Sequence, residues 1–190
     1  MTQLSGAMNI SLQDSPVVES TPIVAGQSRW FAVHTWPKYE KKICATLGKE
    51  GVEAFLPLAT QVHRWSDRRM KITVPLFSCY MFVRIIPLPA NRIQVLRASG
   101  VMAFVGTRGQ GTPIPDCQIE DLRALLGHGV GVDPYPFLTV GRKVRIRGGC
   151  LEGVEGILVA KDGDQKLVVS VDAIQRSVAV SLRGYDVEPA

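Results

Sequence analysis

The sequence lacks the features that mark three broad classes of protein. Its four cysteines lie more than thirty residues apart, without the paired spacing of a zinc site or the density of a disulfide-rich secreted scaffold. No apolar run approaches the roughly 18–20 residues that span a bilayer. Residues 1–28 lack the basic start and the compact apolar stretch of a secretory signal. These absences predict a soluble cytoplasmic protein with no membrane contact, and we expect residues 1–28 to form a disordered tail.

No arrangement of residues points to catalysis. His34, His63 and His128 stand apart from plausible Ser, Cys or Asp partners. A Walker or nucleophile-elbow pattern is missing, and the run RGQGTP lacks the lysine and the helix start of a phosphate loop. Clustered Cys and His residues for a metal ion are missing too. The sequence therefore predicts a protein that is not an enzyme and that holds neither a metal nor a cofactor.

Positive charge is abundant and is concentrated in one part of the chain. The net charge is +5, from 22 Lys and Arg against 17 Asp and Glu. Residues 29–126 hold 14 of the basic and 7 of the acidic residues, whereas residues 134–190 hold 8 and 7. Many basic proteins are merely soluble. A contact with a polyanion, if the protein makes one, is expected in residues 29–126.

Residues 29–126 alternate between strand and helix patterns. RWFAVH has a strand pattern, and Pro37 stands where a helix can begin, with Tyr39, Ile43 and Leu47 on one stripe. Two β-rich runs around SDRR predict a hairpin, CYMFVRII predicts a strand, and two later helices flank one more strand. The order β-α-β-β-β-α-β-α predicts an α/β sandwich with a mainly antiparallel sheet.

The rest of the chain has a different pattern. Residues 127–137 are dense in Gly and Pro and lack periodicity, which predicts a flexible linker. Residues 138–190 contain five short β-rich runs and no helix signal, which predicts a small five-stranded β-barrel. The fold class expected for the chain is therefore α+β. We expect the barrel to be independent of the first domain.

Four motifs in order carry a resemblance to a known family. VRIRGGCLEGVEGILV (144–159) resembles the KOW motif, and WFAVHTWPKYE, PLFSCYMFV and GVMAFVG precede it. With these motifs the chain resembles the NusG family of transcription elongation and antitermination factors. The resemblance implies an NGN domain at residues 29–126 and an SH3-like KOW barrel at residues 138–190. Cys79 stands where housekeeping members tend to have glycine, and PLFSCYMFV resembles the specialised RfaH-like antiterminator branch at least as well.

The strand CYMFVRII is apolar on both faces, with Tyr80 and Phe82 sharing one of them. These two residues are either plain core or part of an exposed protein-binding patch. The resemblance implies that this patch contacts the clamp helices of the largest RNA polymerase subunit. It also implies a second contact, across the polymerase cleft. The candidate polymerase-binding residues are His34, Phe77, Tyr80, Phe82, Asn91, Arg92 and Ile93.

Basic residues form two candidate nucleic-acid contacts. Lys38, Lys42 and Lys49 fall within about 40° on a helical wheel, and such a ridge is either a solvated face or a phosphate-binding one. The resemblance implies contact with non-template DNA, which Trp36 could extend by stacking and Arg97 by its charge. The hairpin tip is either a solubilising turn or a contact with upstream duplex DNA or the polymerase. Its residues are Arg64, Trp65, Arg68, Arg69 and Lys71.

The glycines of the KOW motif are expected to be structural, because turns need positive φ. They are Gly148, Gly149, Gly153 and Gly156. The resemblance implies that the barrel recruits a ribosomal protein, the Rho factor or RNA, while the first domain suppresses pausing or termination. We expect a monomer in which the barrel leaves the Tyr80 patch unmasked. The alternatives are a ribosome-associated RNA-binding protein with a KOW domain and an enzyme acting on nucleic acid.

Overall fold

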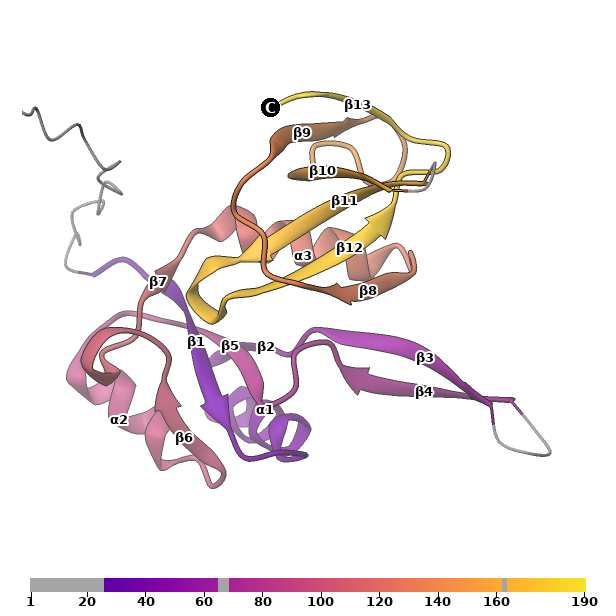
Figure 1. The fold of residues 1–190 in the computed structure, drawn as a ribbon. Coiled ribbons are helices and arrows are strands. Elements are labelled where there is room, and N and C mark those ends of the chain that lie inside the picture. The colour runs from indigo at the N-terminus through magenta and orange to yellow at the C-terminus, as the bar shows by residue number, and fades with distance from the viewer. Residues whose placement is uncertain (1–25, 65–68, 162–163) are drawn as a thin grey trace, which may run out of the picture.

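A computed structural model describes residues 26–64, 69–161 and 164–190, with the backbone alone for residues 61–64, 69, 70 and 161 (Figure 1). The first part of the chain is built on an antiparallel sheet with the strand order β2-β5-β1-β6, and a short strand β7 also pairs with β1. The strands are β1 (Arg29–Thr35), β2 (Glu53–Phe55), β5 (Tyr80–Ile85), β6 (Val101–Phe104) and β7 (Pro113–Ile114). The helices are α1 (Glu40–Lys49), α2 (Pro89–Arg97) and α3 (Asp116–Gly127), and a 3-10 turn, η1 (Thr107–Gly109), precedes β7.

Helix α1 follows the predicted stripe but begins later than the sequence suggests. Ile43 and Leu47 are buried, and Glu40 and Lys49 place charges of favourable sign at its two ends. The chain before it, Trp36–Tyr39, is a turn closed by the Tyr39 N–H on the Trp36 carbonyl oxygen at 3.2 Å. Helix α1 therefore starts at Glu40 rather than at Pro37, because proline here occupies the second position of a turn.

A two-stranded ribbon extends from the first sheet (Figure 1). It consists of β3 (Leu58–Arg64) and β4 (Arg69–Pro75), paired antiparallel along their whole length. The Lys41 ammonium on α1 donates a hydrogen bond of 2.8 Å to the carbonyl oxygen of Thr73 on β4. This contact braces the base of the ribbon against the helix.

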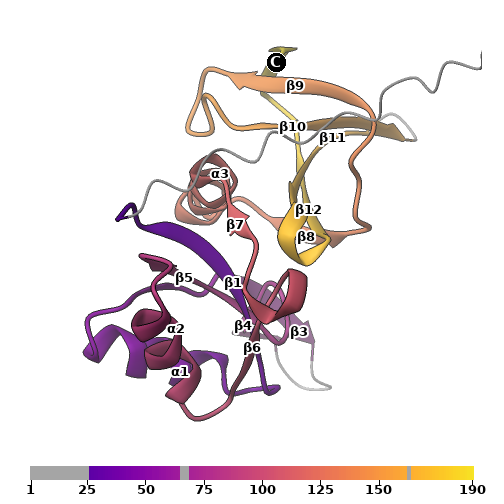
Figure 2. The same ribbon diagram turned by 90° about the vertical axis from the view of Figure 1, so that its left-hand side faces the viewer.

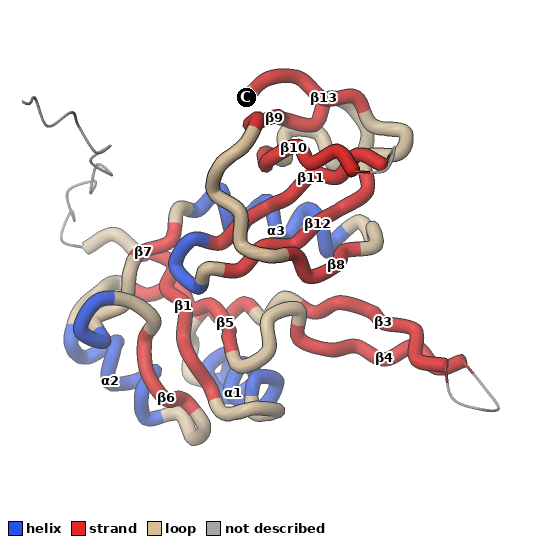
Figure 3. Tube along the Cα trace, in the orientation of Figure 1, coloured by secondary structure: helices blue, strands red, loops and turns tan. Residues whose placement is uncertain are grey.

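The second part of the chain is the predicted β-barrel, with one strand more than expected. Its six-stranded antiparallel sheet has the order β13-β9-β10-β11-β12-β8. Among the described residues, helices α1 to α3 precede this sheet in the chain, and a 3-10 turn, η2 (Asp172–Ile174), lies between β11 and β12. Figure 3 shows the strands of this part in red. The strands are β8 (Val132–Tyr135), β9 (Arg142–Arg147), β10 (Glu155–Lys161), β11 (Asp164–Val171), β12 (Arg176–Ser181) and β13 (Asp186–Pro189). The α+β fold class predicted from the sequence is confirmed.

The extra strand lies in the segment that the sequence predicts to be a linker. β8 pairs with the edge of β12, from Tyr135 opposite Ser177 to Val132 opposite Val180. Beyond it, Leu138 accepts a hydrogen bond of 2.8 Å from the Ser170 hydroxyl and packs against a small cluster on the barrel. Residues 127–137 therefore include the last residue of α3 and the strand β8, so the segment predicted to be a flexible linker contains regular structure.

The first sheet has two apolar faces, and each has its own cover. The inner face carries Phe31, Val33, Met81 and Val83 and packs in one cluster with residues of α1 and α2. The aromatic face is the opposite side of β1 and β5, and α3 lies over it (Figure 2). Its residues are Trp30, Ala32, His34, Tyr80, Phe82 and Arg84.

The barrel is packed on α3 and is not independent of the first domain. The Gln118 amide on α3 donates to an Asp172 carboxylate oxygen at 2.9 Å, and the Asp172 N–H donates back to the Gln118 oxygen at 3.3 Å. One hydrophobic cluster runs from the aromatic face through Leu122 of α3 to the barrel interior, including Leu167 and Val169. We call this junction the α3–barrel contact. It contradicts the expectation of a barrel independent of the first domain, although Tyr80 itself keeps partly exposed surface.

Among the residues that the structure describes, no helix combines the length and the apolar character needed to cross a membrane.

Candidate interaction surfaces

The middle of the aromatic face is core, and one end of it is open. Phe82 has no exposed surface, and its ring stacks on Phe55 at 6.1 Å between centroids and meets Phe77 edge-on at 6.4 Å. His34 and Tyr80 are paired residues on β1 and β5, both half-buried, with ring centroids 5.3 Å apart. Of the four predicted aromatic-face anchors, only this pair offers surface to a partner in the structure.

Cations close the other end of the aromatic face. The Arg123 guanidinium of α3 lies 4.9 Å from the ring centroid of Trp30 and 5.1 Å from that of Phe55. The Arg84 guanidinium also lies over Trp30, 5.9 Å from its ring centroid. Glu53 pairs with both arginines, at 3.0 Å to Arg123 and 3.7 Å to Arg84. Because arginine stacks well on aromatic rings, these contacts seal Trp30 against water.

A second surface combines exposed aromatic rings with lysines at the start of α1. Trp36 is 55% exposed, and its ring meets Tyr39 edge-on at 5.9 Å. The Lys42 ammonium lies 5.8 Å from the centroid of Tyr39, and Lys38 is exposed in the preceding turn with a φ of +68°. We call Trp36, Lys38, Tyr39 and Lys42 the Trp36 surface. Lys49 is exposed at the far end of the helix, and Lys38 is not part of the helical ridge that the wheel predicts.

The resemblance implies that Asn91, Arg92 and Ile93 make the second polymerase contact, across the cleft, and two of these three residues are engaged within the fold. The Asn91 amide donates to the carbonyl oxygen of Ile86 at 2.9 Å. The Arg92 guanidinium lies over Phe31 and Phe104, and it also bonds Gln110. Among their neighbours, Arg97 is exposed and Ile93 is 48% exposed on α2. Asn91 and Arg92 therefore hold α2 in place, whereas Arg97 and Ile93 face solvent.

The hairpin tip is only partly described. Trp65 and Arg68 lie outside the described residues. Arg64 and Arg69 form the last pair of the β3–β4 ladder, and Lys71 is exposed on β4. The structure thus places the flanks of the predicted basic tip at the far end of the ribbon.

The KOW glycines divide into two kinds. Gly148, Gly149 and Gly153 have φ values of +75°, +75° and +86°, which suit glycine in turns. Gly156 differs, because it lies inside β10 and a Cβ there would come within 2.5 Å of the Val168 carbonyl oxygen. Its role is close packing of β10 on β11 rather than a turn.

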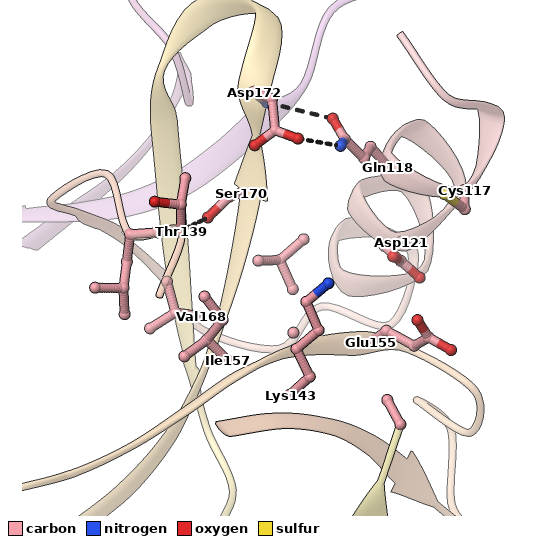
Figure 4. Close-up of a pocket in the computed structure, with 14 residues that line it drawn as sticks. Cys117, Gln118, Asp121, Thr139, Lys143, Glu155, Ile157, Val168, Ser170 and Asp172 are labelled. Atoms are coloured by element: carbon pink, nitrogen blue, oxygen red, sulfur yellow. Dashed lines mark hydrogen bonds between the residues drawn. The ribbon is translucent and has the colours of Figure 1, made fainter. Parts of the chain in front are cut away.

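A pocket of about 390 Å³ lies at the α3–barrel contact and is lined by acidic groups from both sides (Figure 4). Burial is the main cause that raises the pKa of the Asp121 carboxyl from 3.8 to about 6, and the nearby Glu155 charge raises it further. Burial likewise raises the pKa of the Cys117 thiol. The Lys143 side chain reaches into the same pocket from β9 (Figure 4). No group of His, Cys, Asp or Glu that could hold a metal ion is found among the described residues.

An antiparallel α/β sandwich followed by a small barrel with a KOW glycine pattern is the two-part architecture that the resemblance to the NusG family implies. The family model described as "Transcription termination factor nusG" matches residues 28–123. The chain belongs to the NusG family.

Two relatives cover almost the whole chain. The "Transcription termination/antitermination protein NusG" of Lactococcus lactis is 27% identical over 185 residues, 90% of this chain and 98% of the relative. The protein of the same name from Staphylococcus aureus is 30% identical over 178 residues, 86% of this chain and 96% of the relative. A solved structure described as "Domain interaction in Thermotoga maritima NusG" has a TM-score of 0.51 and 23% identity, and it covers 82% of this chain and 94% of that one. This last likeness supports the fold.

The structure also reveals contributors that the sequence pattern alone did not single out. Glu40 is 2% exposed and accepts a hydrogen bond from the Cys79 N–H at 2.9 Å. Its spacing of three and seven residues from Ile43 and Leu47 places it on the buried stripe, and this spacing could have identified it. Gln118 and Asp172 give no comparable signal, because they lie 54 residues apart.

Proposed function

We propose that the protein is a transcription elongation and antitermination factor that binds RNA polymerase at the clamp helices of the largest subunit. The observation that carries this proposal is the His34–Tyr80 pair. It is the half-exposed end of an otherwise sealed aromatic face, in a chain of the NusG family. Aromatic side chains at a rim of this kind supply large contact area at low entropic cost, so they suit a protein partner. Bound there, the first domain suppresses pausing or termination.

The Trp36 surface is the proposed contact for non-template DNA. Exposed rings stack on unpaired bases, and lysines neutralise phosphates. Lys71 and the flanks of the β3–β4 ribbon are proposed to reach upstream duplex DNA. The Lys41 brace to Thr73 supports this role, because it fixes the direction of the ribbon relative to α1.

The barrel is proposed to recruit a ribosomal protein or Rho, and the α3–barrel contact bears on that role. A partner that takes the barrel surface now facing α3 must first separate the two. A domain interaction is described for Thermotoga maritima NusG. By analogy, we propose that this chain alternates between a closed form, seen here, and an open form.

Direct binding to core RNA polymerase tests the proposal. Replacing Tyr80 or His34 by Ala in the full chain should weaken binding about 10- to 100-fold, as expected for an aromatic anchor. Phe137→Ala removes a comparably exposed ring from the barrel and serves as the matched control. Binding to purified ribosomal subunits without binding to polymerase would instead favour the alternative, a ribosome-associated RNA-binding protein.

A further inference from the structure

Two tight turns of the same geometry meet beside the open end of the aromatic face. The Trp36–Tyr39 turn joins β1 to α1, and the Phe77–Tyr80 turn leads into β5. In both, the N–H of the fourth residue donates to the carbonyl oxygen of the first at 3.2 Å. In both, the third residue has a positive φ, +68° at Lys38 and +67° at Cys79. One turn carries the Trp36 surface, and the other carries Tyr80.

The second turn lacks a restraint that the first turn has. A positive φ at the third position favours glycine, because a Cβ approaches the neighbouring backbone oxygen. In the first turn Pro37 stands at the second position, where its fixed φ suits the turn. The second turn has Ser78 there and so lacks this restraint. Cys79 therefore needs support from outside its own turn.

Glu40 provides that support. Its buried carboxylate accepts the Cys79 N–H at 2.9 Å, and on the other side of the residue the Cys79 carbonyl oxygen accepts the Thr35 N–H at 2.9 Å. Hydrogen bonds to a carboxylate are stronger than those to a neutral oxygen. Thr35 precedes the Trp36–Tyr39 turn and Glu40 follows it directly. The strained residue of one turn is thus held by the two residues that flank the other.

We propose that Glu40 is a positioning residue that holds the Phe77–Tyr80 turn in the form that sets Tyr80 beside His34. It thereby fixes the polymerase-binding pair relative to the Trp36 surface, so that one rigid junction presents both. Glu40 itself is buried, so it offers almost no surface to a partner. The inference rests on the proposed function, since it assumes that His34 and Tyr80 bind polymerase.

A rescue experiment in the full chain tests this role. Glu40→Ala should weaken binding to core polymerase about tenfold, as for loss of one anchor. Glu40→Gln keeps an oxygen acceptor and should bind within about threefold of wild type. The double variant Glu40→Ala with Cys79→Gly should recover most of the loss, because glycine adopts positive φ without support. Glu50→Ala, an exposed position just after α1, is the control and should bind as wild type.

Two outcomes would overturn the proposal. In the first, the double variant binds polymerase as weakly as Glu40→Ala; in the second, Glu40→Gln binds as weakly as Glu40→Ala. Either result would mean that Glu40 does not act through Cys79. If Glu40→Ala lacks native circular dichroism, Glu40→Leu, which fills the buried site and removes the acceptor, is compared with Glu40→Leu plus Cys79→Gly. The second should bind more tightly, and no gain overturns the proposal.

A readout without polymerase separates this inference from the proposed function. Nuclear Overhauser contacts between the His34 and Tyr80 rings should be weakened in the Glu40→Ala chain and restored by Cys79→Gly. Contacts that persist unchanged in Glu40→Ala would overturn the positioning role. If Tyr80→Ala binds polymerase as wild type, the proposed binding site is wrong, and the ring contacts still decide what Glu40 does.

Discussion

The two faces of the first sheet have similar apolar residues and different covers. On the inner face, Ile43, Leu47 and Val95 of the helices pack on the strands, and all three are aliphatic and buried. On the aromatic face the cover changes along the strands, from the stacked Arg123 at one end, through Leu122 of α3, to the open His34–Tyr80 pair. One strand face can thus be core at its centre and partly open to solvent at its end. Burial of Phe82 therefore does not argue against a role for Tyr80.

The largest expected effects are the losses of stability when a central residue of either face is truncated. They test whether the centres of both faces belong to the core. Phe82→Ala should lower the free energy of unfolding by about 3–5 kcal/mol, and Leu47→Ala on the inner side by about 2–5 kcal/mol. Chemical denaturation of the full chain measures both. A loss under about 1 kcal/mol for Phe82→Ala, with polymerase binding reduced, would show instead that Phe82 belongs to the interaction surface.

A smaller effect is expected at the α3–barrel contact, which only the aromatic side possesses. Gln118→Ala removes both hydrogen bonds to Asp172 and should weaken the closed form by about 1 kcal/mol, as is typical of exposed hydrogen bonds. Small-angle X-ray scattering should show an increased radius of gyration. Glu120→Ala, exposed on the same helix, is the control. An unchanged radius in both variants would show that apolar packing alone holds the barrel.

The cation cover of Trp30 should contribute less still. Arg123→Met keeps an apolar chain over the ring and removes the charge, so we expect a loss of about 0.5–1 kcal/mol in unfolding free energy. The counterpart on the inner side is Arg92→Met, because the Arg92 guanidinium lies over Phe31 and Phe104 there. Thermal unfolding measures the effect, with Arg97→Met, exposed on α2, as the control. A gain in stability would mean that the positive charge of Arg123 destabilises the folded protein.

The population of the closed form should also depend on pH. Because the pKa of Asp121 is raised to about 6 there, the closed form holds a proton more tightly than the open form. This contribution is complete below about pH 4 and is lost as the pH rises through about 6. The charged groups facing Asp121 are Glu155 and Lys143 from the barrel and Glu120 on its own helix.

Amide shifts of Gln118 and Asp172, followed from pH 5 to 8, measure this dependence. Asp121→Asn should abolish most of it and favour the closed form at neutral pH. Glu152→Gln, an exposed barrel position, should leave it intact. A pH profile identical in wild type and Asp121→Asn would assign the titration to another group.

Local pattern predicted the fold class and the order of elements well. Alternation in CYMFVRII indicated two apolar faces, but it could not say which end of either face stays open, since that depends on α3 and on residues far along the chain. The helical-wheel pattern placed Lys38 on the helix, because it could not show that Pro37 and Lys38 belong to a turn before α1. Cys79 was singled out as a departure from glycine, and its φ of +67° gives the physical reason that glycine suits this position.

The contact between the two parts was beyond prediction for a different reason. Gly and Pro in residues 127–137 indicate a linker by composition, and an edge strand tolerates proline. β8 contains a proline, Pro134, opposite Val178. Its composition therefore does not distinguish it from a linker. The pairing of Gln118 with Asp172 has no periodicity to reveal it, because it arises only when both parts have folded.

The added strand β8 has a consequence for how the barrel behaves when it is separated from the rest. A fragment starting at Leu138, the boundary that composition suggests, would lose β8 and leave β12 as an open edge rich in β-forming residues, SVAVS. Bare edges of that kind pair with other chains. Such a fragment should self-associate, whereas one that begins at Gly127 keeps a short terminal strand whose proline discourages further strand addition. By covering the edge of β12, the glycine- and proline-rich segment is expected to protect the barrel against aggregation.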